Sequence, residues 1–542
     1  MKRWNGWGAT TVDYPLPETA TGLLAEWVGP GTSAAGLSLA EMLARVPPSR
    51  LPDHPLIDTS PEVRLRHARG QSLPDWVALR CGLVDSFPDG VAFPLHDEDV
   101  RTLLAFAGRK GITLIPYGGG TSVVGHINPL PGERPVLTVD MGRMNRLRRF
   151  DEESLLATFG AGVAGPDLEA QLRARGCTLG HYPQSFEYST LGGWIASRSS
   201  GQQSLGYGRI EELFVGGHLQ SPAGPLPLPA TFPVSAAGPD LRHLVLGSEG
   251  RLGVITEATV RASPLPEKEE FYGVFFPDFE SGRAATRAMV QAGLPLSMLR
   301  LSTAVETATT LALAGHPRLI GALERLLALR GAGDEKAMLI LGLTGREELV
   351  RAARKEALGM AGDHGGIQAG RTFGNEWQKS RFRTPYLRNT LWEMGYAVDT
   401  LETAVSWSQA PQTLAAVEAA LHDALQPEGE RVHVFSHLSH FYSDGCSIYT
   451  TYLFRLGRTG EETLARWQQL KGAASRAIVA NGGTISHQHG VGLDHRPYLP
   501  AEKGRLGIET LATVCRQFDP QGIMNPGKLV GPDAEVFDGD ES

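Results

Sequence analysis

The stretch Ile115-Pro-Tyr-Gly-Gly-Gly-Thr-Ser-Val123 decides the fold of this chain. An apolar strand leads directly into three glycines, and two hydroxyl residues follow them. Because glycine has no Cβ, successive backbone N–H groups can converge on an anion, and such amides bind a phosphate or pyrophosphate without a lysine. The Walker sequence GxxxxGK[ST] is absent, which argues against a nucleoside triphosphatase. The stretch therefore predicts a dinucleotide held by its pyrophosphate.

Composition sets the outer limits of the prediction. A chain of 542 residues should fold into two or more domains. The formal net charge is −8, with lysine and arginine scattered along the chain, so we expect no nucleic-acid partner. The four cysteines lack CxxC spacing, which indicates reduced thiols in a cytoplasmic protein. The start has no signal-peptide run and no apolar stretch is long enough for a bilayer, while peripheral membrane contact stays open.

Hydrophobic periodicity predicts mixed helices and strands. Residues 1–87 are rich in proline and turn signals, with one helix expected at 37–45, and we expect them to pack on later parts of the chain without an independent core. Further helices are expected at 97–110, 166–175 and 461–480, and strands at 91–94, 136–140 and 154–158. The Pro-, Ala- and Gly-rich segment 220–239 predicts a long loop or irregular hairpin.

A second glycine pattern, Gly160-Ala-Gly-Val-Ala-Gly165, matches GxGxxG but is weak evidence for a Rossmann site. That site needs a βαβ unit whose second strand ends in an acidic residue about twenty residues on. Here Cys177-Thr-Leu-Gly-His-Tyr-Pro183 follows the helix, and it is too broken by Gly and Pro for a buried parallel strand. An ordinary strand-to-helix turn is the favoured interpretation.

Three other segments have an unusual composition. Residues 181–201 place small and hydroxylated side chains around a Gly-Gly pair, 247–257 run from a glycine turn into a strand, and 519–528 are rich in turn residues. Each alone is compatible with a plain loop. Together with the glycine stretch they predict close approach of the backbone to a flat polar ligand.

The order of these segments resembles the flavoproteins of the vanillyl-alcohol oxidase and para-cresol methylhydroxylase (PCMH) fold, which bind FAD without a Rossmann motif. Within that fold the chain is similar to the alkyldihydroxyacetonephosphate synthases almost end to end. The segments that carry the resemblance are Trp4-Asn-Gly-Trp-Gly8, the glycine stretch, 186–194, 207–213, 247–257 and 482–492. The ending Asn525-Pro-Gly-Lys-Leu529 looks more like FAD-linked D-lactate and glycolate dehydrogenases.

The resemblance implies an α+β fold: a two-subdomain PCMH-type FAD-binding domain plus an α/β cap domain for the substrate, with the C-terminal segment returning to the FAD domain. We expect an N-terminal extension at 1–87, the FAD domain at 88–265, the cap at 266–500 and the returning segment at 501–542. A homodimer is expected.

The resemblance also implies which residues contact FAD. They are Pro116, Gly118, Gly119, Gly120, Thr121 and Ser122 at the pyrophosphate, Ser189, Thr190, Gly193 and Trp194 along the flavin, and Glu249, Gly250, Gly253, Val254 and Ile255 further along the dinucleotide. His126 lies just past the glycine stretch, and a loop-structuring role is favoured over a covalent flavin anchor.

Catalytic candidates come from the C-terminal half. In Ser486-His-Gln-His-Gly490 an extended backbone would place His487 and His489 on one face. Two imidazoles there suggest proton transfer or anion binding. The HxH pair could also supply two metal ligands, or both histidines could be structural. In the synthases this segment carries consecutive histidines at the active site.

By resemblance, three more residues join them. Tyr449 matches a tyrosine used as an acid or base near the flavin, although a core aromatic is the alternative. Arg300 matches an arginine thought to bind substrate phosphate; on an apolar strand it needs a partner, and a buried phosphate would supply one. His181 matches a histidine of the synthase pocket.

The chain departs from the synthase pattern at three positions, which leaves the exact substrate pair open. Gln184 stands in place of an aspartate, Gln488 in place of a histidine, and His437 where an arginine can occur.

The function implied is exchange of the acyl chain of acyl-dihydroxyacetone phosphate for a long-chain alcohol in ether-lipid synthesis, with FAD as cofactor and a lipid-like substrate. Two alternatives stay open: an FAD-linked 2-hydroxy acid dehydrogenase or oxidase, and a flavin- or lipid-binding protein without turnover. The leucines of the helical segment 322–329 could line a channel for the chains or belong to the core, and core is favoured.

Overall fold

The computed structural model describes residues 1–33, 36–314 and 317–531. The C-terminal residues 532–542, part of the expected returning segment, lie outside the described residues. Within the described ranges no helix is long and apolar enough to cross a membrane.

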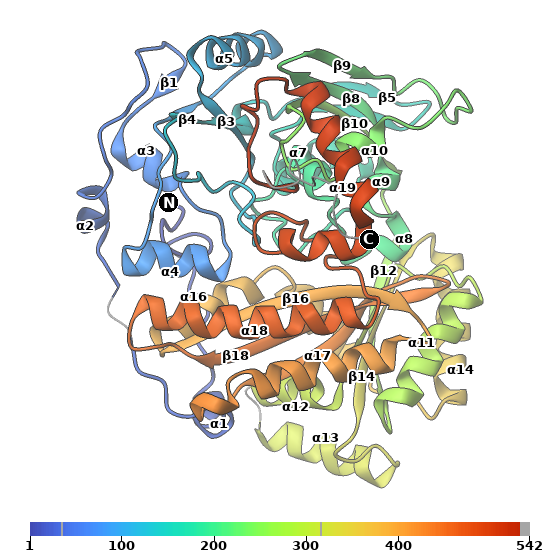
Figure 1. Ribbon diagram of the computed structural model, residues 1–542. Coiled ribbons are helices and arrows are strands. Elements are labelled where there is room, and N and C mark those ends of the chain that lie inside the picture. Colours follow the sequence, from blue (N-terminus) through green and yellow to red (C-terminus); the bar gives the residue numbers. More distant parts are fainter. Residues whose placement is uncertain (34–35, 315–316, 532–542) are drawn as a thin grey trace.

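A four-stranded sheet carries the glycine stretch (Figure 1). Its strands, in spatial order, are β1 (Ile57–Asp58), β2 (Gly90–Ala92), β4 (Val136–Asp140) and β3 (Thr113–Tyr117), the last three parallel. Helix α5 (Asp97–Lys110) connects β2 to β3. Acidic residues in its first turn favour the positive end of the helix dipole, and Gly111 in a left-handed conformation ends it. The predicted helix at 97–110 and strand at 136–140 are confirmed.

A five-stranded antiparallel sheet comes next, in the order β5 (Leu147–Asp151), β6 (Leu156–Gly160), β10 (Val254–Arg261), β8 (Phe214–Ser221) and β9 (Gly224–Leu228). The GxGxxG stretch joins β6 to α6 (Gly165–Arg173). The next strand, β7 (Cys177–Thr178), pairs antiparallel with β11 (Ser263–Pro264) and adds nothing to a parallel sheet. The stretch is therefore an ordinary strand-to-helix turn, as predicted. The predicted hairpin in 220–239 is confirmed by β8 and β9.

The largest sheet has seven antiparallel strands. In spatial order they are β15 (Ile367–Gln368), β12 (Lys268–Phe276), β14 (Ala337–Gly345), β13 (Met298–Ser302), β17 (His433–Phe441), β18 (Gly445–Arg455) and β16 (Tyr396–Ser406). One face is covered by α11 (Phe279–Gln291), α14 (Glu347–Asp363), α17 (Ala410–Ala424) and α18 (Gly460–Ala480) (Figure 1). Apolar side chains of that face pack against these helices. Helices α1 (Glu18–Val28), α12 (Ala304–Leu313), α13 (Pro317–Leu329), α15 (Thr372–Ser380) and α16 (Leu387–Glu393) lie over the other face.

The N-terminal segment differs from its prediction in two respects, because it has more helices than the one expected at 37–45 and has a core of its own. Besides α1 it forms α2 (Leu39–Leu43), α3 (Pro61–Arg66) and α4 (Leu73–Cys81). Met42, Leu65, Leu79 and Phe87 are buried together in a cluster of their own, so the expectation of no independent core is wrong. The segment also packs on later elements, as expected, because Trp7 shares a core with cap-region strands.

The C-terminal residues return to the first two sheets. Helix α19 (Leu499–Phe518) buries Leu499, Ile508 and Cys515 in the core of the five-stranded sheet, and Met524 pairs with Leu114 at the edge of the four-stranded sheet. Short helices complete the described chain: α7 (Leu191–Ser197), α8 (Ser204–Tyr207), α9 (Ile210–Leu213), α10 (Arg242–Val245), η1 (Met141–Arg143), η2 (Thr384–Tyr386), η3 (Gln426–Glu428) and η4 (Arg496–Tyr498). The domain limits at 87, 265 and 500 stay a prediction.

Candidate active site

One cavity of about 1500 Å³ runs from the glycine stretch to the seven-stranded sheet, on the face that α1, α12, α13, α15 and α16 cover. Pockets for a single small molecule usually measure about 300 to 1000 Å³, so this space has room for a dinucleotide and a second molecule. All fifteen residues expected to contact the cofactor line it: Pro116, Gly118, Gly119, Gly120, Thr121, Ser122, Ser189, Thr190, Gly193, Trp194, Glu249, Gly250, Gly253, Val254 and Ile255.

The glycines that follow β3 are required by close contacts. A Cβ on Gly118 would overlap Thr190 Oγ1, and one on Gly119 would overlap the main-chain carbonyl of Tyr188. Gly120 has a φ of 69°, which favours glycine. The backbone N–H groups of residues 119–122 donate no hydrogen bond to another described residue. Free, closely spaced amides of this kind suit an anion.

Residues 189–194 and Gly250 form the opposite wall of the cofactor region, where hydrogen bonds and close backbone contacts also fix the local structure. The side chain of Thr190 caps α7 by accepting a hydrogen bond from the Gly193 amide. Trp194 Nε1 donates to Ser189 Oγ at 2.7 Å. Gly250 has a φ of 76° and approaches the Pro116 ring, where a Cβ would lie 3.0 Å from its Cδ. The two walls therefore fit a flat dinucleotide whose pyrophosphate meets the glycine amides.

Glu249 and His126 form hydrogen bonds that hold the loops around the cofactor region. The carboxylate of Glu249 accepts hydrogen bonds from the amides of Val491 at 2.5 Å and Gly492 at 2.8 Å. Asn525 Nδ2 donates to the Glu249 carbonyl at 2.7 Å. His126 Nδ1 lies 3.0 Å from Ser122 Oγ, which agrees with the predicted loop-structuring role. The carboxylate of Glu249 thus holds residues 491–492 beside the cofactor region.

The histidine loop, residues 486–492, is not the extended segment that the sequence suggested. It is a series of bends around Glu402 of β16, whose Oε1 accepts the amides of Gln488 at 2.6 Å and His489 at 2.9 Å. Burial alone would raise the pKa of Glu402, but the neighbouring histidines and these hydrogen bonds lower it well below its usual range. No sequence motif pointed to Glu402.

The two histidines of this loop differ in access. His489 lines the cavity, and its Nδ1 lies 3.5 Å from Glu402 Oε1. His487 does not line it; its Nε2 lies 2.6 Å from both Arg209 Nη1 and Tyr442 Oη. Burial lowers the pKa of both imidazoles. Because Arg209 stays charged and donates, Nε2 of His487 is an occupied acceptor, which leaves His489 as the imidazole that can take a proton from a substrate.

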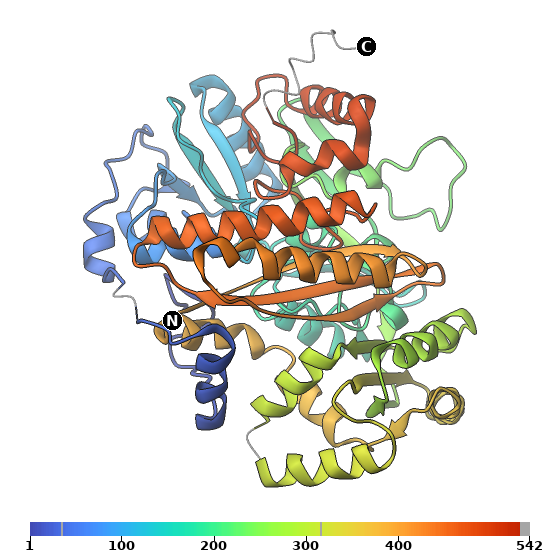
Figure 2. The same cartoon turned by 60° about the horizontal axis from the view of Figure 1, so that its bottom comes forward.

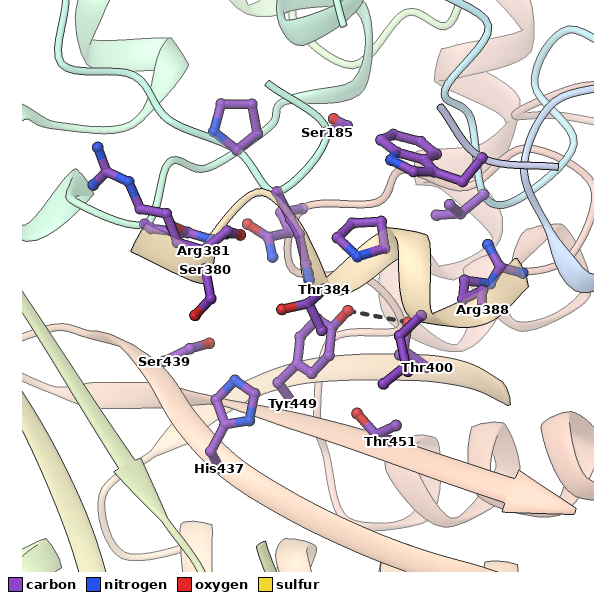
Figure 3. A pocket seen from close by; sticks show the side chains of 18 of the residues that line it. Ser185, Ser380, Arg381, Thr384, Arg388, Thr400, His437, Ser439, Tyr449 and Thr451 are labelled. Carbon is purple, nitrogen blue, oxygen red and sulfur yellow. Dashed lines mark hydrogen bonds between the residues drawn. The ribbon is translucent and has the colours of Figure 1, made fainter. Parts of the chain in front are cut away.

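Tyr449 lies at the centre of the polar part of the cavity (Figure 3). Its hydroxyl donates to Thr400 Oγ1 at 3.1 Å. Its ring stacks on His437 with centroids 5.0 Å apart and meets His489 edge-on at 5.9 Å. Burial raises its pKa, so the phenol is protonated near neutral pH. It can therefore donate a hydrogen bond or a proton to a bound molecule.

Arg300 already has the partner that its sequence position requires. Its Nη2 lies 2.5 Å from Oε1 of the buried Glu306, and His437 Nδ1 lies 3.0 Å from the same oxygen. Burial would raise the pKa of Glu306, but Arg300 and His437 outweigh it and lower the pKa to about 2. Glu306 thus supplies the partner that a buried phosphate was expected to supply. The Arg300 side chain also lines the cavity, and its contact with a substrate phosphate stays a prediction.

Arg388, which no motif singled out, is a second cation at the cavity wall (Figure 3). Its Nη1 donates to the Gln71 carbonyl at 2.7 Å, and its guanidinium lies 4.4 Å from the Trp76 ring centroid. Its buried Nη2 finds no hydrogen-bond partner among the described residues. Burial lowers its pKa. A buried, incompletely paired guanidinium suits a bound anion.

His181 lies behind Trp194, which lines the cavity. Its Nε2 is 2.8 Å from Ser199 Oγ, and its ring centroid lies 4.8 Å from that of Trp194. It does not line the cavity, whereas Gln184, Gln488 and His437 do. Among the described residues no group of three or more His, Cys, Asp or Glu could hold a metal ion.

Comparison with known proteins gives consistent matches. An FAD binding domain matches residues 88–226, and the C-terminal domain of FAD linked oxidases matches 265–529. The chain is 31% identical over 516 residues to an alkyldihydroxyacetonephosphate synthase of Trypanosoma brucei brucei, covering 91% of this chain and 83% of that protein. It is 32% identical over 474 residues to the Dictyostelium discoideum synthase, covering 86% and 77%.

Solved structures agree with these matches. An alkyldihydroxyacetonephosphate synthase superposes with a TM-score of 0.84 at 27% identity, covering 97% of this chain and 99% of that one. A p-cresol methylhydroxylase superposes with a TM-score of 0.67 at 14% identity, covering 87% and 93%. The predicted α+β fold of the PCMH type is therefore confirmed.

Proposed function

The chain belongs to the alkyldihydroxyacetonephosphate synthase family of FAD-linked flavoproteins and binds FAD, and from this we propose that it exchanges the acyl chain of acyl-dihydroxyacetone phosphate for a long-chain alcohol. The observation that carries the proposal is a single cavity that joins a dinucleotide cradle, a cluster of proton-transferring groups and a long apolar lining. In this exchange the bond from C1 to the ester oxygen breaks and one from C1 to the alcohol oxygen forms. The alcohol's proton leaves with the fatty acid, so nothing is oxidised or reduced overall.

FAD supplies an electrophilic ring system at which a carbon next to a ketone can react. The amides of residues 119–122 would hold its pyrophosphate, and residues 189–194 would lie along the ring. We assign proton removal beside the ketone to His489, held by Glu402. The protonated hydroxyl of Tyr449 would donate to the departing carboxylate.

The substrate phosphate would meet Arg388 first. Arg300 carries a bound carboxylate at 2.5 Å, whereas Arg388 has only a carbonyl and an aromatic ring as partners among the described residues. A phosphate brings two negative charges, and a buried unpaired guanidinium gains more from it than a neutralised one. Arg300 and His437 would then set the position of the glycerol-like backbone next to Tyr449.

Helix α13 supports peripheral contact with a membrane. Its Leu319, Leu326 and Leu329 are 68%, 48% and 86% exposed. Arginines on the helix or directly after it are exposed too: Arg318, Arg325 and Arg330. Since Leu319 and Leu326 also line the cavity, we propose that chains enter there from the lipid surface. The homodimer stays a prediction.

The test is an anaerobic incubation of the FAD-loaded protein with acyl-dihydroxyacetone phosphate and hexadecanol, followed by mass spectrometry. An alkyl ether product, with the flavin oxidised at the end, is expected. Absence of the ether would refute the proposal for these substrates.

A second candidate function, oxidation of a 2-hydroxy acid, is favoured by the Asn525-Pro-Gly-Lys528 segment, whose Asn525 lines the cavity. It predicts that D-lactate or glycolate alone bleaches the flavin without air. The exchange predicts that neither does.

A further inference from the structure

The glycine loop, residues 118–122, separates the cofactor cavity from a second, smaller cavity of about 350 Å³. Gly118, Gly119 and Gly120 line both cavities. The walls of the smaller cavity include residues of the N-terminal segment, the end of α3, Tyr188 and the residues that follow β4. The loop is therefore a thin wall, and a side chain in the smaller cavity can contact it from behind.

Lys2 makes this contact. Its Nζ donates to the Gly119 carbonyl at 2.6 Å and lies 5.3 Å from the centroid of the Tyr188 ring. Lys2 lines the smaller cavity and not the larger one. The peptide that joins Gly119 to Gly120 is planar and trans, so its N–H points opposite to its carbonyl. Lys2 thus keeps the Gly120 N–H pointing away from the smaller cavity, and its charge polarises that N–H into a stronger donor.

The ammonium of Lys2 forms no ion pair with a carboxylate within the described ranges. The nearby Asp140 lies 2.9 Å from His67 Nε2 and accepts the Gly142 amide instead. Burial lowers the pKa of Lys2 to about 8, so the ammonium still predominates at neutral pH. The other basic residues of the smaller cavity each have a carboxylate partner: Arg3 has Asp13, Arg66 has Glu62, Arg69 has Asp85 and His67 has Asp140.

A buried ammonium without a bonded carboxylate is costly. An anion on the other side of the glycine loop would offset that cost, because the loop between them is only one chain thick. The free amides of residues 119–122 already favour an anion on that side. The unpaired charge of Lys2 and the free amides therefore point to the same bound group.

The N-terminal segment itself fixes the position of Lys2. Lys2 pairs with Ala9 in an antiparallel bridge, and the Arg3 amide donates to the Gly8 carbonyl at 2.8 Å. Gly8 has a φ of 79°, which favours glycine. The stretch Trp4-Asn-Gly-Trp-Gly8 is thus the tight loop that brings the chain back beside Lys2. The segment then runs past the seven-stranded sheet to α1 (Figure 2).

We propose that Lys2 is a cofactor-positioning residue: through the peptide that it bonds, it holds the Gly120 N–H toward the cofactor cavity and places behind the FAD pyrophosphate the positive charge that the glycine loop lacks. A Walker loop carries its lysine within the loop, whereas this lysine comes from 117 residues earlier in the chain. Docking of the N-terminal segment and binding of FAD then favour each other by the same factor. The proposal concerns FAD alone and does not depend on which substrate is turned over.

The first test measures the FAD affinity of the full chain, from the flavin fluorescence that appears when the FAD-loaded protein is diluted. Lys2→Met keeps the length of the side chain and removes its charge, so the Kd should rise about tenfold or more, as for a lost hydrogen bond to a charged group. Lys2→Arg keeps the charge and should restore most of the affinity. Arg3→Met changes the neighbouring side chain, which bonds Val12 and Asp13 and not the loop, and should leave the Kd near that of the wild type.

The second test separates positioning of the cofactor from a purely structural role. Limited proteolysis within residues 1–33 is followed with and without excess FAD. In the wild type FAD should slow the cleavage, because the docked segment and bound FAD stabilise each other. This protection should shrink in Lys2→Met and persist in Arg3→Met. If circular dichroism shows that Lys2→Met fails to fold, Lys2→Gln takes its place.

Three results would overturn the assignment: wild-type FAD affinity in Lys2→Met, an equal loss of affinity in Lys2→Arg, or an equal loss in Arg3→Met. Equal protection by FAD in the wild type and in Lys2→Met would likewise show that Lys2 only holds the segment in place. Neither test measures ether formation, so a failure here leaves the proposed function standing, and a failure of the exchange leaves the role of Lys2 standing.

Discussion

Two buried carboxylates shape the histidine loop. Glu402 of the seven-stranded sheet accepts the amides of residues 488 and 489, and Glu249 of the cofactor region accepts those of 491 and 492. The loop is thereby tied to the substrate side and to the cofactor side at once. His489 is presented where the two meet, so its position depends on Glu402 as much as on its own backbone.

Glu402→Gln should lower kcat about 10- to 100-fold, because a general base loses the charge that supports it. Activity needs neutral His489 and is lost as the pH falls through its pKa. The charge of Glu402 raises that pKa against the effect of burial, so its removal should shift the acidic limb of the pH–rate profile to lower pH. Retained flavin with an unshifted limb would show that Glu402 has only a structural role.

At the scale of elements, the glycine loop after β3 is the part most sensitive to added volume. In Gly119→Ala the new Cβ meets the main-chain carbonyl of Tyr188, which cannot rotate away as a side chain could. The loop must move, at a cost of about 1 to 3 kcal/mol, and FAD affinity should fall about 5- to 150-fold. Gly132→Ala, with open space around it, is the control. Equal FAD retention in both, measured by absorbance after dialysis, would contradict the cradle.

Local signals explain which elements the sequence predicts. The helix at 97–110 begins with acidic residues and is ended by a glycine, so both of its end signals are local. The glycine loop is likewise recognisable from nine consecutive residues, 115–123. Glu402 shows its role only through contacts with amides 86 and 87 residues away. Arg388 is recognised by its buried Nη2, which has no hydrogen-bond partner within the described ranges, and that requires knowing every neighbour in space. The histidine loop bends because Glu402 draws in two amides, which overrides any local preference for a strand.

At the scale of the whole molecule, the N-terminal segment fastens the cofactor region to the seven-stranded sheet. Lys2 Nζ donates to the Gly119 carbonyl at 2.6 Å. A few residues later, Trp7 exchanges two hydrogen bonds with Asn389 of α16, at 3.1 and 3.0 Å. The Trp7 ring meets Tyr188 edge-on at 5.6 Å. The segment thus touches the glycine loop, the flavin wall and the cap side within seven residues.

Asn389→Ala should weaken the attachment of the N-terminal segment to α16. It leaves the buried amide and carbonyl of Trp7 without partners, at a cost of about 2 to 4 kcal/mol. We expect a lower unfolding midpoint and faster proteolytic cleavage within residues 1–33. Asn481→Ala removes a bond to Ala477 within one helix end and is the control. Unchanged cleavage in Asn389→Ala would mean that the segment is held by other contacts.

Burial of neutral His181 makes stability depend on pH. Burial lowers its pKa to about 3 in the folded state, against an ordinary 6.5. Between those values the unfolded chain binds a proton that the folded chain does not, so the free energy of unfolding falls as the pH falls, by up to about 1.4 kcal/mol per pH unit. The part of the free energy of unfolding that depends on neutral His181 is fully present above pH 6.5 and is lost progressively as the pH falls toward 3.

His181→Gln removes the group whose protonation in the unfolded chain makes the free energy of unfolding depend on pH. At pH 7.5 the variant should unfold at a lower midpoint than the wild type, because Gln replaces a ring packed on Trp194. As the pH is lowered from about 6.5 toward 4.5, the two midpoints should converge and then cross. The exposed His243→Gln should instead follow the wild type throughout. Parallel midpoints for His181→Gln over this range would show that His181 is protonated in the folded protein and that its site is less apolar than its contacts with Trp194 and Ser199 require.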